Sequence, residues 1–277
     1  MSSATASPGT ASSATASSWR KLLADPGEDG HIVQLYQDDD FYGEAITHFA
    51  AEGLVRGESI ILVATQPNWK NISARLRGKG FDPDELFRQG QLTLLDADRT
   101  LPKFMVGNLP DGDIFKPLAR QAIAKARAGG KFPRVRWWGE MVNVLHVEGN
   151  PRGSHRLEEL FDEVAREERI AIFCSFLMDK FDPKIYDEAF GNVCLTHSHV
   201  IPADDYARHR LTVNRAISEI VGDIRGTMLQ SLMSWKATPA LMPSSQALLL
   251  WLKDKMPEQF PAVLARAREL EALNPRR

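Results

Sequence analysis

The segment richest in chemically active side chains is Cys194-Leu195-Thr196-His197-Ser198-His199. A thiolate beside imidazoles can bind a transition metal or contact a small ligand. In a strand, His197 and His199 would point to the same face, whereas in a helix Cys194 and His197 would share a face. Because no second Cys or His motif accompanies this segment, three roles stay open: contact with a small ligand, a structural role, and a metal site of Cys194, His197 and His199.

Glu140 and Cys174 are two further candidates. Glu140 directly follows the expected strand that contains Trp137, and ligands bind at the carboxyl ends of strands in open α/β sheets. A carboxylate among aromatic side chains also needs a partner, and Arg136 or a His is available, so a structural ion pair is the alternative. Cys174 lies inside the apolar run IAIFCSF, which is typical of a buried core residue.

The elements that must position these residues alternate between short β-rich runs and longer amphipathic stretches. Strands are expected at residues 31–36, 59–65, 91–97, 134–138 with a continuation through 139–142, and 170–176. Helices are expected at residues 41–55, 68–77, 115–128 and 155–166. Strands separated by helices of this length indicate βαβ units, so we expect an α/β fold with a mostly parallel sheet and helices on both faces.

Composition divides the chain into three parts. Residues 1–28 begin with a run of Ser, Thr and Ala that could bury almost no apolar surface, and we expect a disordered tail there. The α/β domain then covers residues 29–203. Residues 204–277 carry only helical patterns, with one long helix over 205–235 and two shorter helices over 245–255 and 261–273. This all-helical C-terminal segment either packs on the α/β domain or serves signalling and dimerisation.

Several catalytic motifs are absent from the sequence. The turn after the first expected strand contains Asp38, Asp39 and Asp40 and no phosphate-binding glycine pattern. Three aspartates would repel a polyphosphate unless a metal intervened. They are typical of the start of a helix, and a divalent-ion site is the alternative role for them. The chain also lacks the GxSxG and HExxH patterns, so we do not expect an enzyme.

Charge and hydropathy limit the partners. The chain has 34 Lys and Arg against 36 Asp and Glu, a formal net charge of −2, which gives no electrostatic reason to expect direct nucleic-acid binding. The longest apolar run, residues 247–252, is far shorter than the roughly 20 residues of a membrane-crossing helix. With two cysteines and no secretion signal at its start, the chain is expected in the cytoplasm.

An ordered set of short motifs extends through the α/β region. The motifs are His31 with Tyr36, Gly53-Leu54, Gly57-Glu58, Ala64-Thr65, Gly90-Gln91-Leu92, Asp96-Ala97, Phe104-Met105, Val135-Arg136, Gly139-Glu140-Met141-Val142, Gly149-Asn150, Leu157-Glu158, Cys174, Phe181 and Cys194-x-x-His197. In this order, over about residues 29–203, they resemble the MEDS sensory domain, the methanogen/methylotroph, DcmR-type domain of bacterial and archaeal signalling proteins.

The resemblance implies a fold, a ligand class and a set of contact residues. The family looks like a relative of RecA/KaiC-type ATPases that lacks the phosphate-binding loop, and it is thought to sense simple hydrocarbon derivatives. The ligand-contact candidates that it implies are His31, Tyr36, Glu140, Cys174, Cys194 and His197. A pocket lined by Trp137, Trp138 and Phe173 would favour a small, largely apolar ligand.

These observations predict a cytoplasmic signal-transduction sensor without catalytic activity. It would bind a small, hydrocarbon-derived molecule in the α/β domain and relay the signal through its C-terminal helices to a separate signalling protein, such as a kinase, a transcription factor or an anti-regulator. We expect a small organic ligand rather than a metal, and a homodimer is a further expectation. The alternatives are a nucleotide-binding or hydrolysing enzyme of ATPase-like fold and a ligand-free scaffold or regulator.

Overall fold

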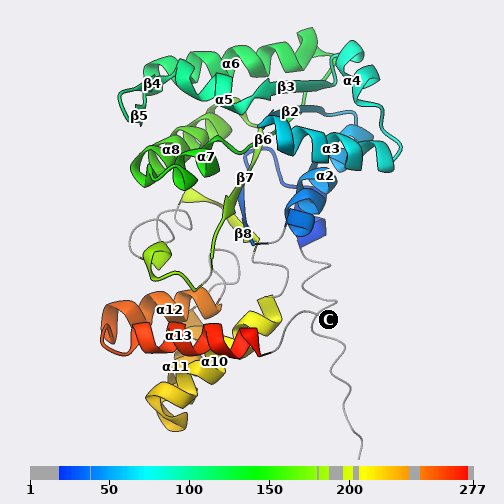
Figure 1. The fold of residues 1–277 in the computed structure, drawn as a ribbon. Coiled ribbons are helices and arrows are strands. Elements are labelled where there is room, and N and C mark those ends of the chain that lie inside the picture. The colour runs from blue at the N-terminus through cyan, green and yellow to red at the C-terminus, as the bar shows by residue number, and fades with distance from the viewer. Residues whose placement is uncertain are drawn as a thin grey trace, which may run out of the picture.

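The computed structural model describes residues 19–37, 39–179, 181–186, 196–201, 206–236 and 244–273. Its centre is a six-stranded parallel sheet in the order β3-β2-β6-β7-β1-β8 (Figure 1). The strands are β1 (His31–Tyr36), β2 (Ser59–Ala64), β3 (Leu92–Asp96), β6 (Val135–Gly139), β7 (Ala171–Leu177) and β8 (His199–Ile201). A short antiparallel hairpin is formed by β4 (Met105–Val106) and β5 (Leu109–Pro110).

Helices cover both faces of the sheet, which confirms the expected fold class. One face packs against α2 (Asp39–Val55), α3 (Gln66–Gly78) and α4 (Pro83–Gln89). The other packs against α6 (Gly112–Arg127), α7 (Met141–Val147) and α8 (Pro151–Glu168). Single turns make up α5 (Ala97–Thr100), η1 (Leu101–Lys103), η2 (Ala128–Gly130) and η3 (Pro183–Tyr186). Strands β1, β2 and β6 are buried along their whole length, and for β2 the continuous apolar run in the sequence predicts this burial.

The predicted strand at 134–138 is present, but its continuation through residues 139–142 is wrong. Strand β6 ends at Gly139, and α7 begins at Met141. The β-branched residues Val142 and Val144 suit a strand locally, yet in the helix Met141, Val142 and Leu145 are buried in the core. Tertiary packing therefore overrides local preference here. Helices α4 and α7, the hairpin and β8 were not predicted as such.

The predicted tail through residue 28 is too long. Residues 19–24 are helical, and Trp19 and Leu23 are buried. Trp19 packs edge-on against Phe41, with ring centroids 5.5 Å apart, because a large apolar side chain is stabilised by leaving water. Residues 1–18 and residue 38 lie outside the described part of the chain.

The C-terminal segment contains α10 (Tyr206–Val221), α11 (Asp223–Lys236), α12 (Ser244–Lys255) and α13 (Phe260–Ala272). The two shorter predicted helices are confirmed, whereas the single long helix is divided at Gly222. This glycine has φ +94°, a left-handed conformation that ends a helix. The apolar residues on the two sides of Gly222 differ in burial, because Ile217 is buried whereas Ile224 and Met228 are exposed.

The C-terminal helices pack on the chain that follows β7. The ring of Tyr186 lies 5.6 Å from that of Phe260, and the Tyr186 carbonyl accepts a hydrogen bond of 2.7 Å from Lys253 Nζ. Arg268 pairs with Asp179 at 2.7 Å. The core that starts between the sheet and α8 is continuous with the core of these helices. Among the described residues, no helix combines the length and the apolar character needed to cross a bilayer.

Candidate functional site

Four chemically active side chains meet inside the α/β domain. His31 starts β1, Cys174 lies in β7, Glu158 comes from α8, and His197 precedes β8; each is at most 2 % exposed. Glu158 Oε2 lies 3.1 Å from His31 Nε2 and 3.2 Å from His197 Nε2. Cys174 Sγ lies 3.6 Å from His31 Nε2. We call these four residues the buried His-Glu-Cys cluster.

Sheet register and helix packing explain this convergence. Strands β1 and β7 are adjacent, and Val33 is aligned with Cys174. Because side chains alternate along a strand, His31 and Cys174 point to the same face of the sheet. Helix α8 covers that face and places Glu158 over them. Ser198, the residue before β8, holds the neighbouring His197 close to β1, because the Ser198 N–H donates to the His31 carbonyl at 2.7 Å.

The cluster has strong internal electrostatics. Burial and the neighbouring His197 lower the pKa of His31. Burial by itself raises the pKa of Glu158, but its contacts with His197 and His31 outweigh that effect and lower the pKa to about 2. Burial and the Glu158 charge raise the pKa of the Cys174 thiol well above its ordinary value. The group therefore combines an ionised carboxylate, two imidazoles and a thiol in a site without water contact.

The cluster contains three of the six predicted contact residues, His31, Cys174 and His197. Cys194 lies outside the described residues. Of the two described residues proposed for a metal, His197 belongs to the cluster and His199 does not, because His199 in β8 is partly exposed and its Nδ1 lies 3.1 Å from Ser198 Oγ. Tyr36 and Glu140 lie elsewhere, at the carboxyl edge of the sheet.

Glu158 was missed as a site residue, although it belongs to one of the motifs quoted for the resemblance. It lies in a helix with many charged residues, where a carboxylate is usually solvated. Its helical neighbours carried a usable signal: Ser154, Phe161 and Ala165 lie four residues before, three after and seven after it, and all are buried. A glutamate on such a face cannot reach solvent and needs a partner.

Glu140 is held by hydrogen bonds within the protein. It is 2 % exposed and lies between the carboxyl ends of β2 and β6, whose following helices leave toward opposite faces of the sheet. Its carboxylate accepts from the Tyr42 hydroxyl at 3.2 Å and also from the Thr65 N–H and the Asn68 amide. Open α/β sheets bind ligands in a crevice at this position. In this protein the hydrogen-bond donors of the crevice already bond to the Glu140 carboxylate.

Tyrosine side chains complete this edge of the sheet. Tyr36 stacks on Tyr42 with ring centroids 4.2 Å apart, and its hydroxyl accepts a 3.4 Å hydrogen bond from Asn143. Burial, followed by the charge of Glu140, raises the pKa of both phenols. Of the alternative ion-pair partners considered for Glu140, Arg136 bonds to Glu58 instead. Because their pKa values are raised, the hydroxyls of Tyr36 and Tyr42 stay protonated at ordinary pH.

We expect Glu140→Gln to lower the free energy of unfolding by about 2 kcal/mol. The amide nitrogen that replaces one oxygen would face N–H or O–H donors, so at least one buried donor would lose its acceptor. Urea denaturation measures the loss, with Glu148→Gln as the matched control because Glu148 is exposed. Equal stability of the two variants would show that the Glu140 hydrogen bonds contribute little.

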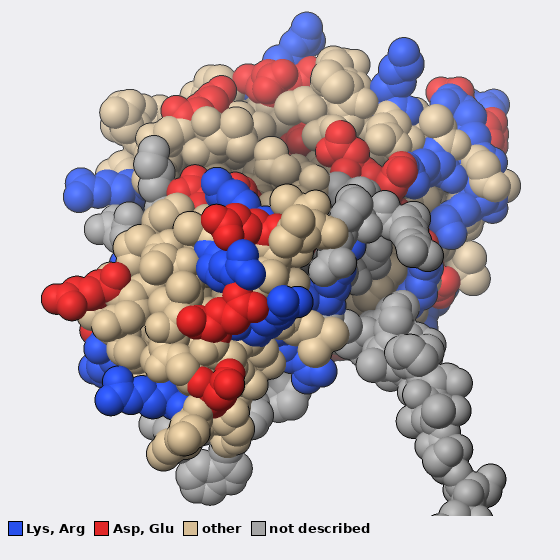
Figure 2. Space-filling model, turned by 60° about the horizontal axis from the view of Figure 1, so that its bottom comes forward, with Lys and Arg blue, Asp and Glu red and all other residues tan. Residues whose placement is uncertain are grey.

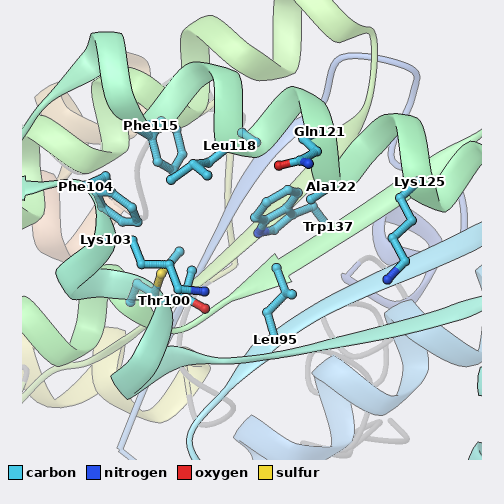
Figure 3. A pocket seen from close by; sticks show the side chains of 12 residues that line it. Leu95, Thr100, Lys103, Phe104, Phe115, Leu118, Gln121, Ala122, Lys125 and Trp137 are labelled. Carbon is cyan, nitrogen blue, oxygen red and sulfur yellow. The ribbon is translucent and has the colours of Figure 1, made fainter.

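A cavity of about 280 Å³ lies between α6 and the sheet. Figure 3 shows the rings of Phe104, Phe115 and Trp137 around it, with Lys103 and Lys125 on opposite sides of Leu95. The remaining lining residues are Thr100, Leu118, Ala119, Gln121, Ala122 and Met141. Trp137 Nε1 is buried and has no hydrogen-bond partner among the described residues.

The predicted pocket is correct for Trp137 and wrong for Trp138 and Phe173. Trp137 and Trp138 are neighbours in β6, so their side chains point to opposite faces of the sheet. Trp138 and Phe173 are fully buried in the core beneath α2 and α3. Of the five predicted contact residues that the structure describes, none lines the cavity.

The fold and these sites define a parallel α/β domain with a buried cluster of reactive side chains and a cavity between its sheet and α6. The family model for MEDS, described as MEthanogen/methylotroph, DcmR Sensory domain, matches residues 30–193. Because the match spans more than half of the chain, the protein belongs to the MEDS family, and the resemblance seen in the sequence is confirmed. Membership indicates a sensory role in signalling. No curated protein sequence matches the chain.

Proposed function

We propose that this protein is a non-enzymatic sensor that binds a small, largely apolar molecule in the Trp137 cavity and transmits the binding event to its C-terminal helices. The observation that carries this proposal is an apolar cavity inside a domain of a sensory family. Its volume of about 280 Å³ suits a small organic molecule rather than a nucleotide. The hydrocarbon-derived ligand expected from the sequence has this character.

The lining also specifies the polar part of the ligand. Three aromatic rings supply apolar contact area, while the unpartnered Trp137 Nε1 offers one buried donor. Lys103 and Lys125 add positive charge near the opening. A ligand with an apolar body and one hydrogen-bond acceptor would satisfy the indole N–H, which otherwise costs free energy. Alcohols and carboxylates meet this requirement, and a pure hydrocarbon does not.

A continuous series of contacts leads from the cavity to the C-terminal helices. Met141 lines the cavity and begins α7. In the same helix, Asn143 accepts a 2.9 Å hydrogen bond from the Leu177 N–H at the end of β7. Two residues later, Asp179 pairs with Arg268 of α13. Movement of α7 on ligand binding would therefore shift the end of β7 and bias the helical segment.

The helical segment also provides a surface for a protein partner. Ile224 and Met228 of α11 are 81 % and 61 % exposed, and they lie one helical turn apart. Figure 2 shows acidic and basic side chains interspersed on this end of the molecule. One ion pair of the segment joins Arg215 and Glu219 at 2.8 Å. We propose that a separate signalling protein or a second copy of the chain uses this apolar strip.

Toluene, benzyl alcohol and benzoate test the cavity, because they share a ring and differ in the acceptor. We expect benzyl alcohol and benzoate to bind the full-length protein more tightly than toluene, as measured by calorimetry. Ala122→Phe should abolish binding of all three by filling the cavity, whereas Ala124→Phe on the exposed side of α6 should not. Trp137→Phe should weaken the binding of benzyl alcohol about fivefold and leave the affinity for toluene unchanged, since one hydrogen bond is worth roughly 1 kcal/mol.

Other outcomes favour the alternatives. Binding that survives in Ala122→Phe would place the ligand outside this cavity. Saturable binding of ATP with Mg²⁺, together with turnover, would favour the nucleotide enzyme. A protein that binds neither the aromatic probes nor ATP, yet still captures its partner through the helical segment, would favour the scaffold.

A further inference from the structure

We propose that the buried His-Glu-Cys cluster is a binding site for a single zinc-class transition metal ion, separate from the Trp137 cavity. The four ligand atoms lie within 4.8 Å of one another. Two imidazoles, one carboxylate and one thiolate form a donor set that Zn²⁺ prefers. The site lies in the interior, with every donor at most 2 % exposed.

Three of the separations between ligand atoms lie close to those in a tetrahedral site. Bonds of about 2.0–2.3 Å from zinc to nitrogen, oxygen and sulfur place neighbouring ligand atoms about 3.3–3.8 Å apart. The separations here are 3.1 Å and 3.2 Å from Glu158 Oε2 to the two imidazoles and 3.6 Å from Cys174 Sγ to His31 Nε2. Only small side-chain shifts are needed to receive the ion.

The outer contacts of the first histidine support this assignment. His31 Nδ1 lies 3.0 Å from the Thr196 carbonyl oxygen, which can only accept. Nδ1 therefore carries the hydrogen, and in a neutral ring Nε2 presents a lone pair to Glu158 and Cys174. An imidazole that donates its distant N–H to a carbonyl is the usual arrangement of a metal-binding histidine. Without a cation, the Nε2 lone pair and the Glu158 oxygen would repel each other.

The proposed ion would join segments that are distant in sequence. His31 belongs to β1, Cys174 to β7 and Glu158 to α8, while His197 leads into β8 at the edge of the sheet. Strand β8 has three residues and, within the described part of the chain, pairs with β1 at the edge of the sheet. A metal bond to His197 would fix this short strand, because metal affinity for the folded chain becomes folding free energy.

Untagged protein, purified without chelators, is analysed for metal and then reconstituted with Co²⁺. We expect about one zinc per chain, and a near-ultraviolet thiolate-to-Co²⁺ charge-transfer band on reconstitution. Cys174→Ser should remove that band, and Glu158→Gln or His197→Gln should lower Co²⁺ affinity at least about tenfold. His199→Gln is the matched control, because His199 lies two residues from His197 and outside the cluster.

Two observations would overturn the proposal. One is wild-type protein that contains no metal and shows no charge-transfer band at stoichiometric Co²⁺, which would leave the cluster as a proton-sharing network. The other is a band or a zinc content that persists unchanged in Cys174→Ser. X-ray absorption of the wild-type zinc edge decides the case even if a variant fails to fold, because a sulfur neighbour must be present in the spectrum.

Discussion

Replacing Arg136 with methionine is expected to lower the free energy of unfolding by about 3–5 kcal/mol. Arg136 is 1 % exposed, and its guanidinium bonds to Glu58 within the core. It also donates to the carbonyls of Leu23 at 2.7 Å, Ala24 at 2.9 Å and Phe49 at 3.0 Å. The methionine variant would leave the Glu58 carboxylate and three carbonyls without these donors. Removing one partner of a buried ion pair is strongly destabilising because the remaining charge stays buried without a partner.

Urea denaturation followed by circular dichroism measures this loss. Arg134→Met is the control, because Arg134 approaches the same carboxylate at 3.5 Å but is 43 % exposed, so its removal should cost far less. Arg136→Met combined with Glu58→Leu should regain part of the stability, since it also removes the unpaired carboxylate. Equal losses for Arg134→Met and Arg136→Met would show that burial is not the deciding factor.

The parallel fold was predictable because short strand-forming runs, some of them continuously apolar, alternate with helices that have a regular apolar spacing. Ser59–Ala64 is buried along its whole length, as the continuous apolar run SIILVA is expected to be in a parallel sheet. The helix beginning at Met141 was not predictable in the same way. Its seven residues suit either state locally, and only packing against the core selects the helix.

The candidate sites were predictable in part. His31 and His197 are 166 residues apart, and the pattern that named both could not show that they meet, since this depends on β8 pairing with β1. The cavity depends on α6 lying over Trp137, a contact between elements that no local spacing encodes. The alternation of side chains along β6, in contrast, could have shown that Trp137 and Trp138 line different faces.

Phe260→Ala is expected to loosen the C-terminal helices, at a cost of about 3–5 kcal/mol, while the sheet stays folded. Phe260 begins α13, is 4 % exposed and packs edge-on against Tyr186 at 5.6 Å. Faster amide hydrogen exchange in α12 and α13, with unchanged exchange in β2 and β6, would show this result. Leu273→Ala is the control, because Leu273 is 71 % exposed at the end of the same helix.

The same variant tests the proposed relay. If the Asp179–Arg268 contact passes the signal on only while Phe260 docks α13, Phe260→Ala should bind benzyl alcohol with wild-type affinity, and the ligand should no longer alter exchange in the C-terminal helices. This follows because the cavity and this contact share no residues. Exchange that instead rises equally in the sheet and the helices would mean that both parts unfold together. The predicted boundary between residues 203 and 204 would then mark a change in the sequence pattern, and the two parts would form a single folding unit.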